Sequence, residues 1–232
     1  MARIDELRAG LQQTRDRIWA AADAAGRDPR EIQLVVVTKF FPESDVRLLA
    51  ELGVTDVGEN RHQEAEAKQA ACADLGLRWH FIGALQSNKA AAVASYADVV
   101  ASVDRAKVLA GLTRGAAKRD GLLDVLVQVS LDEPGADHRA GVAPDALLDL
   151  CDRVVESEHL RLGGVMAVAP LGKDPRPAFE RLAQSAAVVR RTHPDARWIS
   201  AGMSQDLEEA VAAGATHVRV GSAILGNRPP IK

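Results

Sequence analysis

The feature that most constrains the fold is a regular alternation of short apolar runs and amphipathic segments along the whole chain. Short β-branched runs bounded by Gly, Asp or Pro are typical of buried parallel strands. We expect strands at residues 34–38, 54–57, 79–82, 98–101, 123–129, 162–167, 196–199 and 217–220. We expect helices at residues 43–52, 60–74, 87–95, 104–119, 144–157, 175–192 and 204–213. This α/β alternation predicts a parallel sheet.

Two architectures fit eight alternating strands and helices: a closed (β/α)8 barrel of the TIM type and an open doubly wound sheet. The length of 232 residues falls within the roughly 200–250 residues that such a barrel occupies as one domain, and it favours the barrel. The open sheet remains the alternative, because closure is not visible in a sequence. Residues 3–25 carry apolar side chains at helical spacing and predict an extra amino-terminal helix. We therefore expect one barrel domain over residues 1–232.

Composition argues against several classes of partner and compartment. The net charge is −3 without a basic run, and aromatic residues make up 3% of the chain, so neither nucleic acid nor a membrane surface is an expected partner. Only Cys72 and Cys151 are present, which predicts a reduced setting without disulfides. The amino-terminal segment lacks the apolar core of a signal peptide, and we expect a cytoplasmic protein. The six histidines show no HxH or HExxH spacing, so no metal site is expected.

An amine is expected at the carboxyl-terminal edge of the first strand, which belongs to the active face of such a barrel. Lys39 ends the apolar run LVVVTKF. Burial lowers the pKa of a lysine, and a neutral amine can attack an aldehyde to form a Schiff base. The alternative is a lysine that reaches solvent or pairs with a carboxylate. Asn60, in the motif GEN, follows the second strand.

An anion site is expected where the last two strands end. Ser204 in SAGMS, with Gly221 and Ser222 in GSAILG, brings small residues and hydroxyls to the corner where many barrels bind phosphate. The alternative is that these glycines only permit turns and that Ser204 caps helix 204–213. Arg219 lies within the last strand and could contact the phosphate, a pyridine nitrogen or a structural carboxylate.

Other polar residues are given structural roles. We expect His80 to be a hydrogen-bonded histidine of the core. Glu59 could act as a base, but a carboxylate beside Arg61 more often forms a solvated ion pair, which we expect here. Tyr96, the only tyrosine, falls in a helical stretch before the fourth strand. The serines lack a GxSxG context, so the sequence does not support nucleophilic serine chemistry.

Six motifs follow one another along the chain from about residue 3 to residue 228. They are VVVTKF, VGENRHQEAEAK, WHFIGALQSNK, SVDR, GVMAVAP and ISAGMSQDLEEAVAAGATHVRVGSAILGNR. In this order they resemble the pyridoxal-phosphate homeostasis protein family. The resemblance implies a fold type III barrel, like the amino-terminal domain of alanine racemase, that binds pyridoxal 5′-phosphate (PLP). The loop DEPGADHRAGV, with His138 and Arg139, departs from the family's usual Lys-containing version.

The resemblance also implies a role for each candidate site residue. Lys39 matches the lysine that forms the Schiff base, and Arg219 matches the arginine that faces the pyridine nitrogen. Three residues match the phosphate-cradling positions, and a fourth matches a residue that lines the cofactor beside the second strand. These are Ser204, Gly221 and Ser222 for the phosphate and Asn60 for the cofactor wall.

Two functions follow: a carrier in PLP homeostasis that supplies apo-enzymes, and a PLP-dependent amino-acid racemase or decarboxylase. Racemisation needs an acid–base pair on opposite faces of the substrate. In the alanine racemase fold the second face receives a tyrosine from another domain across a dimer, and we expect this chain, given to residue 232, to lack that domain. Arg219 would also weaken the ring as an electron sink. We expect a monomeric carrier with no catalytic residues; a phosphate-sugar barrel enzyme is a third reading.

Overall fold

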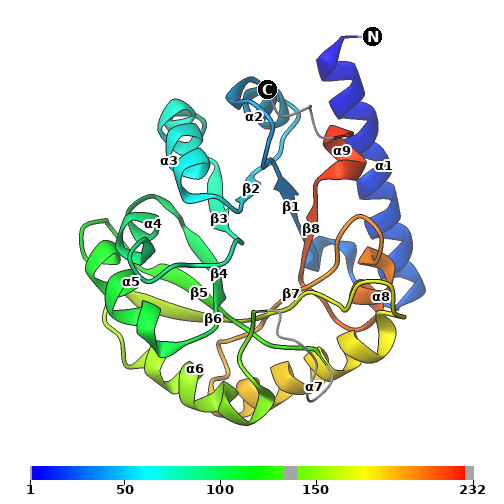
Figure 1. Cartoon of the computed structure of the whole chain (residues 1–232). Coiled ribbons are helices and arrows are strands. Elements are labelled where there is room, and N and C mark those ends of the chain that lie inside the picture. Colours follow the sequence, from blue (N-terminus) through cyan, green and yellow to red (C-terminus); the bar gives the residue numbers. More distant parts are fainter. Residues whose placement is uncertain (1, 133–139, 228–232) are drawn as a thin grey trace.

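The computed structural model describes residues 2–132 and 140–227, and its centre is a closed barrel of eight parallel strands (Figure 1). The strands follow chain order around the barrel, and β1 closes it against β8. They are β1 (Gln33–Val37), β2 (Asp56–Glu59), β3 (Arg78–Phe81), β4 (Val99–Val103), β5 (Leu123–Gln128), β6 (Leu160–Met166), β7 (Trp198–Ser200) and β8 (His217–Val220). The predicted (β/α)8 barrel is confirmed, and the open sheet is wrong. His138 and Arg139 lie outside the described residues.

Helices surround the barrel and follow the strands in turn, as Figure 1 shows. They are α1 (Arg3–Ala24), α2 (Glu43–Glu51), α3 (His62–Ala71), α4 (Ala90–Tyr96), α5 (Leu109–Ala116), α6 (Leu147–Val155), α7 (Arg176–Thr192), α8 (Leu207–Ala212) and α9 (Ser222–Leu225). Several begin later than the sequence predicted. Residues 106–108 and 144–146 form 3-10 turns ahead of α5 and α6, because short 3-10 pieces commonly lead into α-helices. Among the described helices, none is long and apolar enough to cross a membrane.

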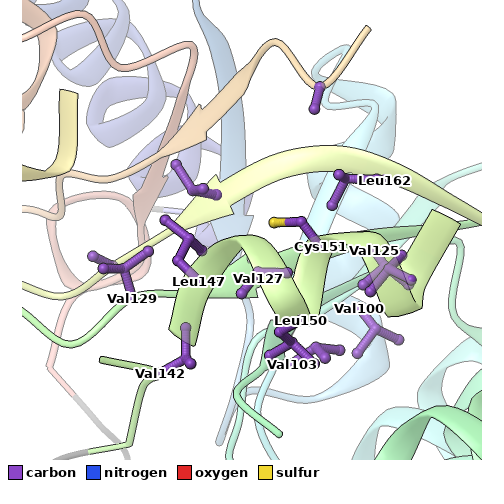
Figure 2. Packing of buried hydrophobic residues seen from close by; sticks show 14 of the residues in the cluster. Val100, Val103, Val125, Val127, Val129, Val142, Leu147, Leu150, Cys151 and Leu162 are labelled. Atoms are coloured by element: carbon purple, nitrogen blue, oxygen red, sulfur yellow. The ribbon is translucent and has the colours of Figure 1, made fainter. Parts of the chain in front are cut away.

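Apolar packing between helices and the outer face of the barrel provides most of the core. Figure 2 shows one part of it, where Leu147, Leu150 and Cys151 of α6 lie near Val125 and Val127 of β5. All five side chains are buried. Burial of apolar area at about 25 cal/mol per Å2 makes such layers the main favourable term in folding. The strand ends above this core are therefore held on a rigid frame.

The extra amino-terminal helix α1 lies beside α8 and α9, at the edge where β8 closes the barrel (Figure 1). Its buried face is apolar, as the helical spacing predicted. A Cβ built on Gly10 would lie 2.8 Å from the carbonyl oxygens of both Ala223 and Ile224, so only glycine allows α1 this close to α9. Arg17 adds a two-pronged ion pair to Glu208, at 2.7 and 2.8 Å, and donates to the carbonyl oxygen of Ser204 at 3.0 Å.

A polar layer fills one part of the barrel interior. His80 is buried, and its Nε2 lies 2.7 Å from Oδ1 of Asp56, as expected of a hydrogen-bonded core histidine. His217 of β8 is buried beside it, with the ring centroids 6.3 Å apart. Buried polar groups are tolerated where they find partners, and these side chains find them within the barrel.

Candidate functional site

A cavity of about 480 Å3 opens at the carboxyl ends of β1, β6, β7 and β8. The loops that follow these four strands form most of its wall. Five of the six predicted site residues line it: Lys39, Ser204, Arg219, Gly221 and Ser222. Asn60 is not among the described residues that line it. The volume is in the range of sites for small molecules and cofactors.

Lys39 reaches the cavity because a buried strand stops just before it. β1 lies between β2 and β8, and Thr38 extends the strand by donating its backbone N–H to the carbonyl oxygen of Gly58 at 3.0 Å. The next turn closes when the N–H of Phe41 donates to the carbonyl oxygen of Thr38 at 3.1 Å. Lys39 is half-buried at the start of this turn. A strand-end amine on the cavity wall agrees with the sequence prediction.

The anion corner is built from the β7–α8 and β8–α9 connections. The hydroxyl of Ser222 donates to Oγ of Ser204 at 3.2 Å, and the N–H of Ala223 approaches the same oxygen at 3.4 Å. A Cβ on Gly221 would lie 3.0 Å from the carbonyl oxygen of Val37, so the end of β8 fits tightly against the end of β1. Two hydroxyls and the backbone at the start of a helical turn therefore face one corner, which is a donor set suited to an anion.

Ser204 does not cap the following helix, so this part of the alternative is wrong. α8 begins at Leu207, and Asp206 stands at its cap position. Oδ1 of Asp206 accepts a hydrogen bond from the N–H of Met203 at 2.6 Å and closes the turn. The side chain of Ser204 is thereby left to the anion corner.

Arg219 is a buried cation, 5% exposed, in the wall between β7 and β8. Its guanidinium donates to Oγ of Ser200 at 2.7 Å and to the carbonyl oxygen of Ala167 at 2.8 Å. Both acceptors are uncharged, so these two hydrogen bonds are not those of a structural carboxylate pair. Burial lowers the pKa of Arg219 to about 10 against the opposing charge of Asp206, and the side chain remains charged at neutral pH.

The prediction of a solvated pair between Glu59 and Arg61 is wrong. Glu59 is only 1% exposed, and its Oε1 lies 2.8 Å from Nζ of Lys68, on α3. Arg61 instead places its guanidinium 5.0 Å from the ring centroid of Phe40. The reason is that all four residues of β2 are buried, so a carboxylate there needs a partner inside the fold.

Asn60 follows β2, and Tyr96 is the last residue of α4. Oδ1 of Asn60 and the hydroxyl of Tyr96 are buried and have no hydrogen-bond partner among residues 2–132 and 140–227. Tyr96 ends α4, where its ring stacks on His62 at 5.9 Å. Burial raises the pKa of Tyr96 far above its ordinary value. Across the same two ranges, no His, Cys, Asp or Glu side chains gather in threes as a metal site would need.

Sequence reasoning missed several residues of this site. Ser200 and Ala167 hold Arg219, and Leu171 and Lys173 of the β6–α7 loop line the mouth of the cavity. The place of Ser200 at the carboxyl end of an expected strand was a signal for the first. A backbone carbonyl such as that of Ala167 leaves no signal in the residue type.

Comparisons with known proteins agree with this geometry. Residues 44–229 match the family model described as alanine racemase, N-terminal domain. The pyridoxal phosphate homeostasis protein of Mycobacterium tuberculosis is 45% identical, over 97% of this chain and 94% of the relative. The structure of PipY from Synechococcus elongatus with PLP bound has a TM-score of 0.77 and 33% identity, over 91% of this chain and 99% of PipY. Alanine racemase from Corynebacterium glutamicum shares the fold, with a TM-score of 0.69 at 15% identity, over 99% of this chain and 63% of the racemase.

Proposed function

The chain belongs to the family of pyridoxal phosphate homeostasis proteins, and on that premise we propose that it binds PLP in the cavity and acts in intracellular PLP homeostasis. Lys39 is the amine that forms a Schiff base with the cofactor aldehyde. The functional unit is one barrel domain over residues 1–232, and it acts as a cytoplasmic monomer. It holds PLP for supply to apo-enzymes without efficient racemase activity.

One observation carries the proposal: an amine, an anion corner and a buried arginine line the same cavity. PLP, when bound, supplies an electrophilic aldehyde on a ring that can act as an electron sink. The residues present fit its three functional parts. Lys39 would take the aldehyde, Ser204, Gly221 and Ser222 would hold the phosphate, and Arg219 would face the ring nitrogen. Glycine fits position 221 with the least strain, because a Cβ there would press on the carbonyl oxygen of Val37.

Asn60 completes the proposed set of cofactor-binding residues. It follows β2, the strand that pairs with β1. Its buried Oδ1 has no partner within the described part of the chain, and an unpaired buried acceptor is costly unless a ligand or water satisfies it. This acceptor supports a place for Asn60 beside the cofactor.

The position of Tyr96 favours a carrier over a racemase or decarboxylase. A racemase needs a second acid–base group opposite the lysine. The only tyrosine of the sequence is half-buried in α4 and is absent from the described wall of the cavity. The charged guanidinium of Arg219 would also oppose protonation of the ring nitrogen, which weakens the ring as an electron sink.

Borohydride reduction followed by peptide mass mapping tests the proposal. After PLP is added to the native protein, we expect a reduced pyridoxyl adduct on the peptide that contains Lys39. Lys39→Ala should lose this adduct and keep weak binding through the anion corner. Lys173→Ala is the matched control, because Lys173 lines the same cavity, and it should keep the adduct. An adduct on Lys173, or label spread over surface lysines, would contradict the assignment to Lys39.

A further inference from the structure

We propose that Lys68 and Glu59, which are buried, and Glu64, which is half-buried, form a clamp that fixes the backbone on both sides of Lys39 and so positions its amine. We refer to these three residues as the clamp. The inference rests on the proposed function in one respect, namely that Lys39 is the reacting amine. The clamp residues touch the neighbours of Lys39, so they act as positioning residues.

The ammonium group of Lys68 is the centre of the clamp. Lys68 is 6% exposed, and its Nζ donates to three oxygens: the carbonyl of Thr38 at 2.8 Å, Oε1 of Glu59 at 2.8 Å and Oε1 of Glu64 at 2.7 Å. An ammonium group has three donors, so these contacts use its full capacity. One of them is the backbone carbonyl of the residue that immediately precedes Lys39.

The two carboxylates extend the clamp to both sides of Lys39. Oε1 of Glu59 accepts a hydrogen bond from the hydroxyl of Thr38 at 2.7 Å. Oε1 of Glu64 accepts a hydrogen bond from the backbone N–H of Phe40 at 2.6 Å. The residue before Lys39 and the residue after it are thus both tied to one charged cluster that α3 and β2 carry.

The backbone at Phe40 shows why such fixation is needed. Phe40 has φ of +72°, in the left-handed region that a bulky residue rarely occupies. That conformation is strained and persists only where the surroundings hold it. The short bond from the N–H of Phe40 to Glu64 is one such restraint. Without it the turn can relax, and the direction of the Lys39 side chain changes with it.

Stability alone is a weak reason for a cluster of this kind. Burial raises the pKa of Glu59, although the nearby ammonium of Lys68 opposes this. Buried ion pairs often contribute less than apolar residues of similar size, because their desolvation offsets the attraction. Stability therefore explains the clamp less well than its contacts with the two residues that flank the proposed reactive lysine.

Paired substitutions on α3 test the clamp. Glu64→Ala removes the contacts to Lys68 and Phe40, whereas Glu66→Ala on the same helix removes only an exposed carboxylate 3.8 Å from His62. We expect Glu64→Ala to slow the borohydride-trapped addition of PLP to Lys39 about tenfold, because small misplacements of a reacting group have effects of this size or larger. Glu66→Ala should react like the native protein.

Pyridoxine 5′-phosphate separates positioning from general damage to the site. It keeps the phosphate and the ring but carries an alcohol in place of the aldehyde, so its binding does not require the amine of Lys39. We expect equilibrium dialysis to give the same affinity for the native protein and both variants. Equal trapping rates for Glu64→Ala and Glu66→Ala would overturn the clamp. It would also be overturned if Glu64→Ala lost affinity for pyridoxine 5′-phosphate by the same factor as it lost trapping rate.

Acetylation of the cofactor-free protein distinguishes failure of the clamp from failure of the proposed function. The acetylation of Lys39 by dilute acetic anhydride is compared with that of exposed Lys107 in the same sample. If native protein forms no adduct on Lys39, the proposed function fails. The clamp is supported if Glu64→Ala changes this ratio and Glu66→Ala does not. It is contradicted if Glu64→Ala leaves the ratio unchanged. Lys68→Met, measured in the same ways, replaces Glu64→Ala if the latter does not fold.

Discussion

At the scale of single residues, Arg219 shows what a buried charge costs the fold. It is buried and hydrogen-bonded to two uncharged oxygens. Its pKa falls from 12.5 to about 10, which corresponds to roughly 3 kcal/mol against the charged form. Two neutral hydrogen bonds return about 1 kcal/mol each. On this balance the charge does not stabilise the fold, which agrees with the ligand-binding role proposed for it.

Arg219→Met should therefore separate binding from stability. We expect PLP to bind more weakly, while the cofactor-free protein stays as stable as the native one or becomes up to about 1 kcal/mol more stable, since apolar residues often replace buried charges without loss. Urea denaturation monitored by circular dichroism measures the free energy of unfolding. A loss of several kcal/mol would show instead that Arg219 is a structural residue.

Single residues also show where prediction from sequence succeeds. The position of Lys39 was predictable because an apolar run ended at an amine, and both features are local. The partner of Glu59 was not, because Lys68 is nine residues away on a helix whose rotation against β2 is set by tertiary packing. Local pattern thus found the amine but missed the clamp beside it.

At the scale of elements, the contact of α1 with α9 supports the anion corner from outside the barrel. Glycine within a helix normally weakens it by about 1 kcal/mol relative to alanine. At position 10 the added Cβ would meet three backbone atoms of α9 within 3 Å, so alanine should be less stable than glycine there. We expect Gly10→Ala to destabilise the protein by about 1–3 kcal/mol, as overpacking does. It should also weaken PLP binding, because α9 must shift.

Gln13→Ala is the control for helix propensity alone, since Gln13 lies on the exposed face of the same helix. Thermal unfolding of both variants is compared with that of the native protein. The proposed close contact between Gly10 and α9 is contradicted if Gly10→Ala raises the midpoint of thermal unfolding as Gln13→Ala does.

Elements were predictable in kind and order but not at their ends. Each expected strand overlaps an observed one, because β-branched runs between turn residues mark buried strands. The start of helix 204–213 was misplaced, since Asp206 rather than Ser204 takes the cap position. Serine and aspartate are both good caps, so the residue types alone could not decide between them.

At the scale of the whole molecule, His217 should make stability depend on pH. Burial, together with the charge of nearby His80 and more weakly that of Arg78 and Arg219, lowers its pKa from 6.5 to about 3, against the opposing effect of Asp56. Between these values the unfolded chain binds a proton that the folded protein does not bind. The free energy of unfolding should therefore be at its full value above pH 6.5 and fall by up to about 1.4 kcal/mol per pH unit down to about pH 3.

Urea denaturation of the native protein and of His217→Gln at several pH values measures this dependence. We expect His217→Gln to flatten the dependence of the free energy of unfolding on pH between pH 4 and 6.5. The pKa of Asp56 is lowered from 3.8, so its titration changes stability mainly below this window. His159→Asn is the control, since His159 is exposed. Equal slopes in His217→Gln and the native protein would show that other groups cause the dependence.

Closure of the barrel was inferred from length and count rather than from any residue. The pairing of β1 with β8 joins residues about 180 positions apart, such as Val35 with Arg219, and no local pattern encodes it. The same pairing brings Lys39 and Gly221 to one cavity. The site could therefore be predicted as a set of strand ends only once a barrel was assumed.

The pairing of β1 with β8 also has a consequence for biosynthesis. During synthesis on the ribosome, Lys39 emerges well before Arg219, Gly221 and Ser222. A nascent chain therefore carries the proposed reactive amine long before it carries the groups proposed to hold phosphate. Capture of the aldehyde in a defined orientation must wait until the two ends of the chain meet. Under the proposed function, cofactor loading is a late event that reports a completed barrel.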